Sequence, residues 1–156
     1  MKVKDIMTTK LYTLHPKDKL SAAQKLLTGQ DFHHIIVKVN NKVVGIISQG
    51  DLLYTKELIS KNADQFPVEL KFGPQYVEDV MTSDPYTIEE DALLEEALTL
   101  MISKRINALP VTKSNNLVGM ITSFDMLVLL KKQTQQILKI RNLVLNTQSP
   151  FLSELS

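Results

Sequence analysis

The sequence predicts an α+β (mixed α/β) fold built from two β-α-β-β-α units that are related by a pseudo-twofold axis. The first observation is an internal repeat: Val3–Leu53 aligns without a gap with Val77–Leu127, and 16 of the 51 aligned positions are identical. Chance would give about three identities at ordinary residue frequencies. The second observation is that helical and strand-like segments follow one another in the same order in both copies.

Each copy opens with a short β segment, near Tyr12–Leu14 in the first copy and Tyr86–Ile88 in the second. A helix is predicted next, because apolar residues recur at the i, i+3, i+4, i+7 spacing of a face that packs on a core. These apolar positions are Leu20, Ala23, Leu26 and Leu27 in the first copy, and Leu94, Ala97, Leu98 and Met101 in the second.

Two β-rich runs and a closing helix complete each copy. The runs flank a turn that contains Asn, a residue that tolerates positive φ. The runs and turns are Ile35–Val39, Asn40-Asn41 and Val43–Ile47 in the first copy, and Leu109–Thr112, Ser114–Asn116 and Leu117–Ile121 in the second. The closing helices begin near Asp51 and Asp125, and the second continues to about Leu145.

One such unit is too small to cover its own sheet well, so we expect the two copies to pack against each other. The predicted segments are a first repeat at 1–61, a linker at 62–76, a second repeat at 77–131, and a C-terminal helix and tail at 132–156. Pseudo-twofold packing creates two related clefts between the copies, where ligand pockets tend to lie. Apolar residues of the closing helices are expected to seek cover in a homodimer. They include Leu52, Leu53, Met126 and Leu127.

Composition and charge narrow the classes of function. Of the 156 residues, 44% are hydrophobic and 22% are charged, as in ordinary globular proteins. Eighteen basic and 17 acidic side chains leave a net charge of +1, which does not favour nucleic acid as the main partner. The sequence has no cysteine, no signal-peptide pattern and no apolar run long enough to span a bilayer. We therefore expect a cytoplasmic protein with no membrane partner.

Both copies end their last β run with a hydroxyl residue followed three positions later by an aspartate. The two motifs are Gly45-Ile46-Ile47-Ser48-Gln49-Gly50-Asp51 and Gly119-Met120-Ile121-Thr122-Ser123-Phe124-Asp125. This spacing is typical of a capping box, which stabilises a helix start by about 1 kcal/mol. The same junction also suits a phosphate or a ribose, because free N–H groups, a hydroxyl and a carboxylate meet there. The two interpretations do not exclude each other.

These motifs, together with the Asp-Ile-Met-Thr8 and Asp-Val-Met-Thr82 openings and the run Asn107–Val111, give the sequence a family resemblance. From about Val3 to Leu130 it resembles a tandem pair of cystathionine-β-synthase (CBS) domains, also called a Bateman module. The resemblance implies a non-catalytic regulatory module that binds an adenosine-containing ligand, such as AMP, ADP, ATP or S-adenosylmethionine, between the repeats. It also implies a homodimer, an effector protein that the sequence does not identify, and no required cofactor.

The family pattern builds each cleft from both repeats. It implies one cleft lined by Thr8, Tyr12, Phe32, His33, Thr122 and Asp125. It implies a second cleft lined by Thr82, Tyr86, Ile106, Asn107, Ser48 and Asp51. Backbone near His34 or Ala108 would read the edge of the adenine, and the two aspartates would hold ribose.

The sequence departs from the family pattern at two places. Ile36 stands where the second repeat has Pro110, and Gly50 and Phe124 stand where many members carry a basic residue. A polyphosphate would therefore lack one partner, which favours AMP or adenosine over ATP. The cleft beside Gly50 is expected to be the roomier of the two.

Other interpretations fit fewer residues. His33-His34 suggests a metal site, but neighbouring strand residues point to opposite faces. Lys104-Arg105 fits a helix end better than a phosphate clamp, and the two repeated tyrosines either pack on the core or line a pocket. We do not expect an enzyme, because the sequence has no Gly-rich phosphate loop and no nucleophile elbow. The alternative function is a dimerisation or protein-interaction module that has no physiological nucleotide.

Overall fold

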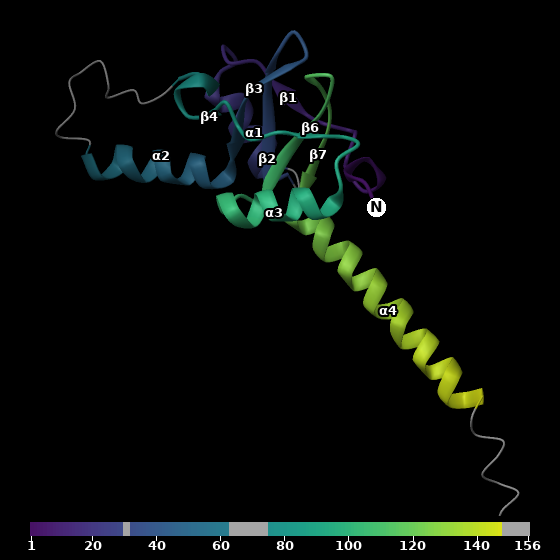
Figure 1. Cartoon of the computed structure of the whole chain (residues 1–156). Helices are drawn as coiled ribbons and strands as arrows, with labels where there is room; N and C mark the ends of the chain where they lie inside the picture. Colours follow the sequence, from purple (N-terminus) through teal and green to yellow (C-terminus); the bar gives the residue numbers. More distant parts are fainter. Residues whose placement is uncertain (30–31, 63–74, 148–156) are drawn as a thin grey trace, which may run out of the picture. The chain divides into compact units, whose positions relative to one another are not determined.

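The computed structural model describes residues 1–29, 32–62 and 75–147, and of residues 56–62 and 146–147 it describes only the backbone. The chain divides into two compact units, Met1–Ile121 and Thr122–Ser156. The first unit holds the two sheets, and the second holds the C-terminal helix (Figure 1). Most of the predicted linker at 62–76 and the tail beyond 147 lie outside the described residues.

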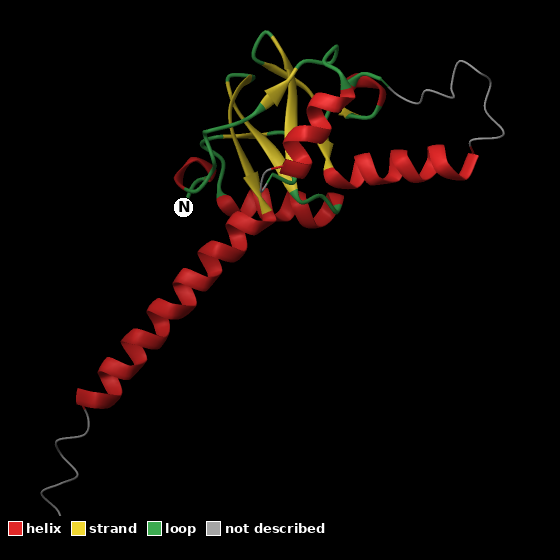
Figure 2. Cartoon of the chain, turned by 180° about the vertical axis from the view of Figure 1, so that it is seen from behind, coloured by secondary structure: helices red, strands yellow, loops and turns green. Residues whose placement is uncertain are grey.

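The described residues form two small sheets and four α-helices, which confirm the predicted α+β fold. One sheet has the strand order β1-β2-β3-β4 and the other β5-β6-β7. Figure 2 shows the strands in yellow and the helices in red. The strands are β1 (Thr13–Leu14), β2 (His34–Val39), β3 (Lys42–Ser48), β4 (Thr82–Ser83), β5 (Ile88–Glu89), β6 (Ala108–Lys113) and β7 (Asn116–Thr122). The helices are α1 (Leu20–Gly29), α2 (Gln49–Asn62), α3 (Leu94–Lys104) and α4 (Ser123–Thr147), and the 3-10 turns are η1 (Val3–Asp5) and η3 (Val77–Asp79).

Local patterns predicted the hairpins correctly. Both central residues of each turn have positive φ: 47° and 63° at Asn40 and Asn41, and 48° and 65° at Ser114 and Asn115. Positive φ at both positions defines a type I′ turn, whose twist matches that of the flanking strands. Strand β4 was not predicted, because its two residues are held by β3 of the other repeat rather than by a neighbour in sequence.

The core of the first repeat lies between α1, α2 and one face of its sheet. It contains Leu14, Leu20, Ala23, Leu27, Ile35, Val37, Ile47, Leu52 and Val77. Leu52 is 5% exposed and belongs to this core, so the expectation that it seeks cover in a dimer is wrong. Its neighbour Leu53 is 67% exposed, because adjacent helix positions point about 100° apart.

The first residues of each repeat are hydrogen-bonded to the other repeat. The Val3 N–H donates to the carbonyl of Ala92 (3.0 Å), and the Val77 N–H donates to the carbonyl of Asp18 (2.9 Å). Both valine side chains are fully buried. The donors are 74 residues apart in the sequence, and so are the acceptors, so the two contacts are pseudo-twofold equivalents.

The two openings then add a strand contact to the partner repeat. Thr8 exchanges two backbone hydrogen bonds of 2.9 Å with Met120, and Thr82 is paired with Ile46 through β4 and β3. A glycine next to each contact makes room for a methionine. A Cβ atom at Gly45 would overlap the Sδ atom of Met81, and one at Gly119 would lie 2.6 Å from the Sδ atom of Met7.

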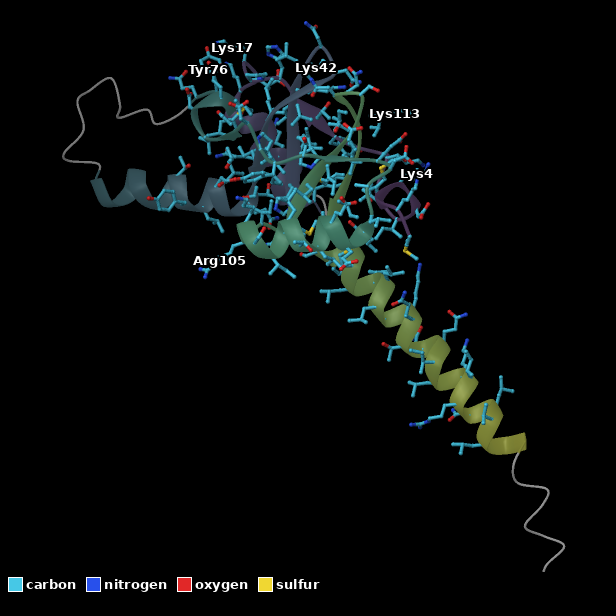
Figure 3. The ribbon with its side chains drawn as sticks, viewed as in Figure 1. Lys4, Lys17, Lys42, Tyr76, Arg105 and Lys113 are labelled. Carbon is cyan, nitrogen blue, oxygen red and sulfur yellow. The ribbon has the colours of Figure 1, made fainter. Side chains whose placement is uncertain are left out.

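The ion pairs at two equivalent places of this exchange have reversed polarity. Lys4 Nζ lies 2.8 Å from Asp91 Oδ1, and Lys2 Nζ lies 2.9 Å from the same oxygen. At the equivalent place in the other half, Lys17 Nζ lies 2.5 Å from Glu78 Oε1, and Figure 3 marks Lys4 and Lys17. The opening segment therefore supplies the cation in one contact and the anion in the other.

The Gly45–Met81 contact predicts a site-specific loss of stability. Gly45→Ala should lower the free energy of unfolding by about 1–3 kcal/mol, because the added methyl group must displace the partly buried Met81 side chain. Urea denaturation measures the change. Gly50→Ala is the matched control, since a Cβ atom there lies at an ordinary 3.6 Å from Ser48 Oγ. Equal effects of the two substitutions would contradict the close contact.

The lysine cluster at Asp91 predicts an acid-sensitive contribution to stability. Hydrogen bonds from Lys2 and then Lys4 lower the pKa of the Asp91 carboxyl from 3.8 to about 2. A carboxyl whose pKa is lower in the folded state stabilises the fold above the unfolded pKa and loses that effect as the pH falls toward 2. Asp91→Asn should therefore flatten the fall of the melting temperature between about pH 4 and pH 2. Glu95→Gln, at an exposed acid without an ion pair among the described residues, should leave the profile unchanged.

Candidate ligand-binding site

The junction between β3 and α2 forms a complete capping box. Ser48 is the last residue of β3, and its backbone N–H and its hydroxyl both donate to Asp51 Oδ2 at 2.7 Å. The Asp51 N–H donates back to Ser48 Oγ at 3.3 Å. Oδ1 of Asp51 has no hydrogen-bond partner among the described residues, so one carboxylate oxygen remains available to a ligand.

The second unit contains an equivalent box. The Thr122 N–H and hydroxyl donate to Asp125 Oδ2 at 2.7 Å, and the Asp125 N–H donates to Thr122 Oγ1 at 3.3 Å. The helix-cap interpretation of both motifs is therefore correct. It leaves open the binding interpretation, because the cap uses only one oxygen of each carboxylate.

Strand register places three predicted side chains on one face of the first sheet. His34 is directly opposite Ser48, and Thr82 is directly opposite Ile46. Direct partners in antiparallel strands share a face, and residues two apart along a strand share it too. Thr82, Ser48 and His34 therefore lie on the face opposite the core residues Ile35 and Ile47, with Asp51 bonded to Ser48.

This face combines open and covered positions. Thr82 is exposed, whereas Ser48, Asp51 and His34 are half-buried. Ile36, on the same face, is only 1% exposed, so the cluster borders a covered apolar surface. Converging polar groups are one feature of small-ligand sites, and Thr82, Ser48, Asp51 and His34 provide it here.

The pKa of His34 is lowered from 6.5, first by burial and then by the nearby His33. Asp51 acts in the opposite direction and favours the protonated imidazole. His33 itself is turned toward α2, where its Nδ1 atom lies 3.2 Å from Gln49 Oε1. Gln49 Nε2 also donates to the carbonyl of Leu27 at 2.5 Å, so the two histidines have different environments.

The remaining residues of the predicted Asp51 cleft lie where β5 and β6 of the second sheet begin. β5 and β6 are parallel, with Ile88 opposite Val111. Tyr86 precedes β5 by two residues and is 50% exposed, while Ile106 and Asn107 directly precede β6. Ala108, the first residue of β6, is 7% exposed and offers backbone rather than side chain. That these residues complete the Asp51 site stays a prediction.

The sequence predicts that Lys104 lies at a helix end. The structure also shows where its side chain lies. Its Nζ atom lies 5.0 Å from the centroid of the Tyr86 ring, which is a cation–π distance. Arg105 has a φ of 54° and ends α3 in the left-handed conformation. The pattern of a basic pair at a helix end predicted the termination but not the contact with the tyrosine.

The residues predicted for the other cleft are partly gathered. The rings of Tyr12 and Phe32 lie 4.9 Å apart and are tilted by 54°. Thr8 pairs with Met120 on β7. Thr122 and Asp125 belong to the second unit, so their grouping with Thr8, Tyr12, Phe32 and His33 stays a prediction.

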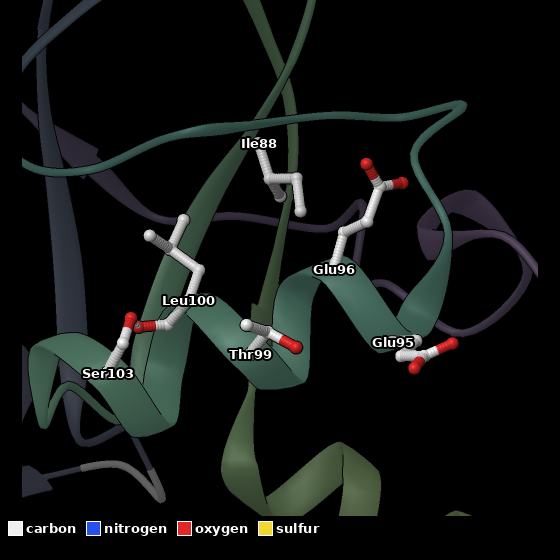
Figure 4. A pocket seen from close by; sticks show the side chains of 6 residues that line it. All are labelled: Ile88, Glu95, Glu96, Thr99, Leu100 and Ser103. Atoms are coloured by element: carbon white, nitrogen blue, oxygen red, sulfur yellow. Dashed lines mark hydrogen bonds between the residues drawn. The ribbon is translucent and has the colours of Figure 1, made fainter.

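A shallow pocket of about 460 Å³ lies elsewhere, along α3 and β5. It is lined by Ile88, Glu95, Glu96, Thr99, Leu100 and Ser103, as Figure 4 shows. Glu96 accepts from the Leu93 N–H at 2.6 Å, and the Ser103 hydroxyl donates to the Leu100 carbonyl at 3.2 Å. Glu96 and Ser103 therefore bond to backbone groups of α3 and its N-cap, and none of the predicted site residues lines this pocket.

Comparison with known proteins places the chain in a family. The model of the CBS domain matches residues 3–57 and 77–132. The chain belongs to the CBS-domain family and carries a tandem pair of these domains. Among the described residues, none of the helices is both long and apolar enough to span a membrane.

Two curated relatives differ in how much of their length this chain covers. The uncharacterized protein YlbB of Bacillus subtilis is 31% identical over 127 residues, which cover 80% of this chain and 79% of that protein. An inosine-5'-monophosphate dehydrogenase of Korarchaeum cryptofilum is 28% identical over 114 residues, which cover 72% of this chain but only 21% of the enzyme.

Two similar crystal structures contain adenosine compounds. CBSX2 in complex with AMP is 25% identical, with a TM-score of 0.72 and coverage of 85% of this chain and 98% of that chain. The CBS domain pair of MJ0100, in complex with 5'-methylthioadenosine and S-adenosyl-L-methionine, is 25% identical, with a TM-score of 0.68 and the same coverage.

Proposed function

We propose that the chain is a non-catalytic regulatory module that binds an adenosine-containing ligand at the site of Thr82, Ser48 and Asp51. The observation that carries the proposal is the strand register, which brings an opening threonine of one repeat onto the same sheet face as the capping box of the other. Similar CBS pairs bind AMP or S-adenosylmethionine, which supports an adenosine compound as the ligand.

The geometry of the box suits a ribose. A ribose presents two adjacent hydroxyl donors, and Asp51 offers Oδ1, which no described residue occupies. Hydrogen bonds to a charged acceptor are the stronger kind, each contributing about 1.5–3 kcal/mol. The exposed hydroxyl of Thr82 adds a second polar contact, and Tyr86, Ile106 and the Asn107-Ala108 backbone form the wall for adenine in this proposal.

The regulatory role rests on the kind of residues at the site. Thr82, Ser48 and Asp51 can hold a ligand, and the hydrogen bond from the Ser48 hydroxyl to Asp51 Oδ2 is part of the helix cap. The module would therefore report ligand binding to an effector protein. A net charge of +1 and the absence of cysteine fit a role in the cytoplasm without nucleic acid or membrane.

Replacing the two aspartates one at a time tests the function. Asp51→Ala should weaken AMP binding at least about tenfold, because it removes the charged acceptor for ribose. Asp125→Ala is the matched control, since it breaks an identical box and should cost the same stability of about 1 kcal/mol. Calorimetry measures affinity, and urea denaturation checks folding of each variant. Unchanged AMP affinity in both variants would leave the motifs as helix caps and favour an interaction module without a nucleotide.

We further propose that the chain forms a homodimer through its closing helices. Leu53 on α2 and Leu127 on α4 occupy equivalent repeat positions and are 67% and 61% exposed. Light scattering should give a mass twice that of the 17.6 kDa chain. Changing both leucines to Glu should produce a monomer, whereas Leu93→Glu, at another exposed apolar position, should not. A wild-type mass of one chain at micromolar concentration would refute the dimer.

A further inference from the structure

The Asp51 site contains one group that can change its charge near neutral pH. His34 faces the same side of the sheet as Thr82 and Ser48, since it is directly opposite Ser48 in the register of β2 and β3. Direct partners in antiparallel strands have Cβ atoms about 4.5–5.5 Å apart, so the imidazole lies beside the capping box. The equivalent position of the second repeat holds Ala108, so this feature belongs to one site only.

A ligand that carries a phosphate meets an electrostatic problem here. Asp51 is negatively charged, and Gly50 offers no cation before it. An anion placed beside a carboxylate is unfavourable unless a positive charge lies between them. Among the described residues, the titratable group next to this carboxylate is His34, with only His33 and Asp51 acting on it electrostatically.

We propose that His34 is a specificity residue of the Asp51 site, which takes up a proton when an adenosine ligand bearing a phosphate binds and stays neutral with uncharged adenosine. This inference rests on the proposed function. The neighbours on this face agree with it: β3 presents the uncharged Ser48, β4 presents the uncharged Thr82, β1 presents the uncharged Thr13 opposite Ile36, and α2 presents Asp51. An anionic ligand adds a second negative charge to this group, and two anions outweigh the burial that keeps the free imidazole neutral.

The sign of the pH dependence follows from this coupling. The free imidazole has a pKa below 6.5, so it is neutral at pH 7.5. Binding of a phosphate raises the pKa of His34, so the complex holds more protons than the free protein. The affinity for AMP should therefore increase as the pH falls from 8 to 6, by at most about tenfold per pH unit for one linked proton. The affinity for adenosine should not increase.

Calorimetry of AMP and adenosine binding at pH 6, 7 and 8, in two buffers of different ionisation enthalpy, tests the proposal. Wild-type protein should take up a proton with AMP but not with adenosine. His34→Gln should lose this uptake, keep adenosine affinity within about twofold, and retain only the dependence that comes from the phosphate of AMP itself. His15→Gln is the matched control, because His15 lies outside the proposed site, where its Nδ1 atom accepts from the Lys17 N–H at 3.2 Å, and this variant should behave as wild type.

The outcomes separate the two proposals. Proton uptake and pH dependence that are the same in His34→Gln and in wild type would overturn the role of His34 while leaving adenosine binding intact. Failure of wild type to bind either compound would overturn the proposed function and this inference together. A measurement on wild type needs no variant at position 34: the NMR-detected pKa of the His34 imidazole should rise when AMP saturates the protein, and an unchanged pKa would overturn the inference.

Discussion

The exchange of opening segments between the repeats is the contact on which the rest of the structure depends. Val3 and Val77 are buried in the opposite repeat, and their N–H groups complete its backbone hydrogen bonding. A buried N–H without a partner costs about 1–3 kcal/mol, so separating the two repeats would carry a free-energy cost for each of them. Val77 also lies in the apolar cluster of the first repeat, so that cluster is complete only when the second repeat is in place. The folding of each domain therefore depends on the presence of the other.

The candidate site is a consequence of the same exchange. Thr82 reaches the sheet of the first repeat only because β4 pairs with β3, and this register sets the threonine two positions along from Ser48. Gly45 and Met81 lie in close contact beside this pairing, since a Cβ atom at position 45 would require the Met81 side chain to shift. Residues that contact no ligand in this proposal thus decide where the ligand-contacting hydroxyl lies.

Much of this arrangement could be predicted from the sequence, because the informative patterns are local. Helix periodicity, the Asn-containing turns and the capping boxes each depend on residues within a few positions of one another. What could not be predicted depends on pairing between distant segments. Strand β4, the Met81–Gly45 contact and the cation of Lys104 over Tyr86 all join residues whose contact is invisible in local spacing. The position of His34 beside Ser48 is of the same kind, since only the register assigns it to the Asp51 site.

The reversed ion pairs favour pairing of a first repeat with a second repeat over pairing of two identical repeats. Two first repeats from different chains would bring Lys4 against Lys17, and two second repeats would bring Glu78 against Asp91. Like charges would meet in both of these assemblies, whereas opposite charges meet when a first repeat docks with a second. An ancestor of half the length that paired with itself could not have carried such a code, because both partners had the same residues. Charge reversal at two surface positions thus became possible only once the two halves could carry different residues, and it involves no residue of the buried core.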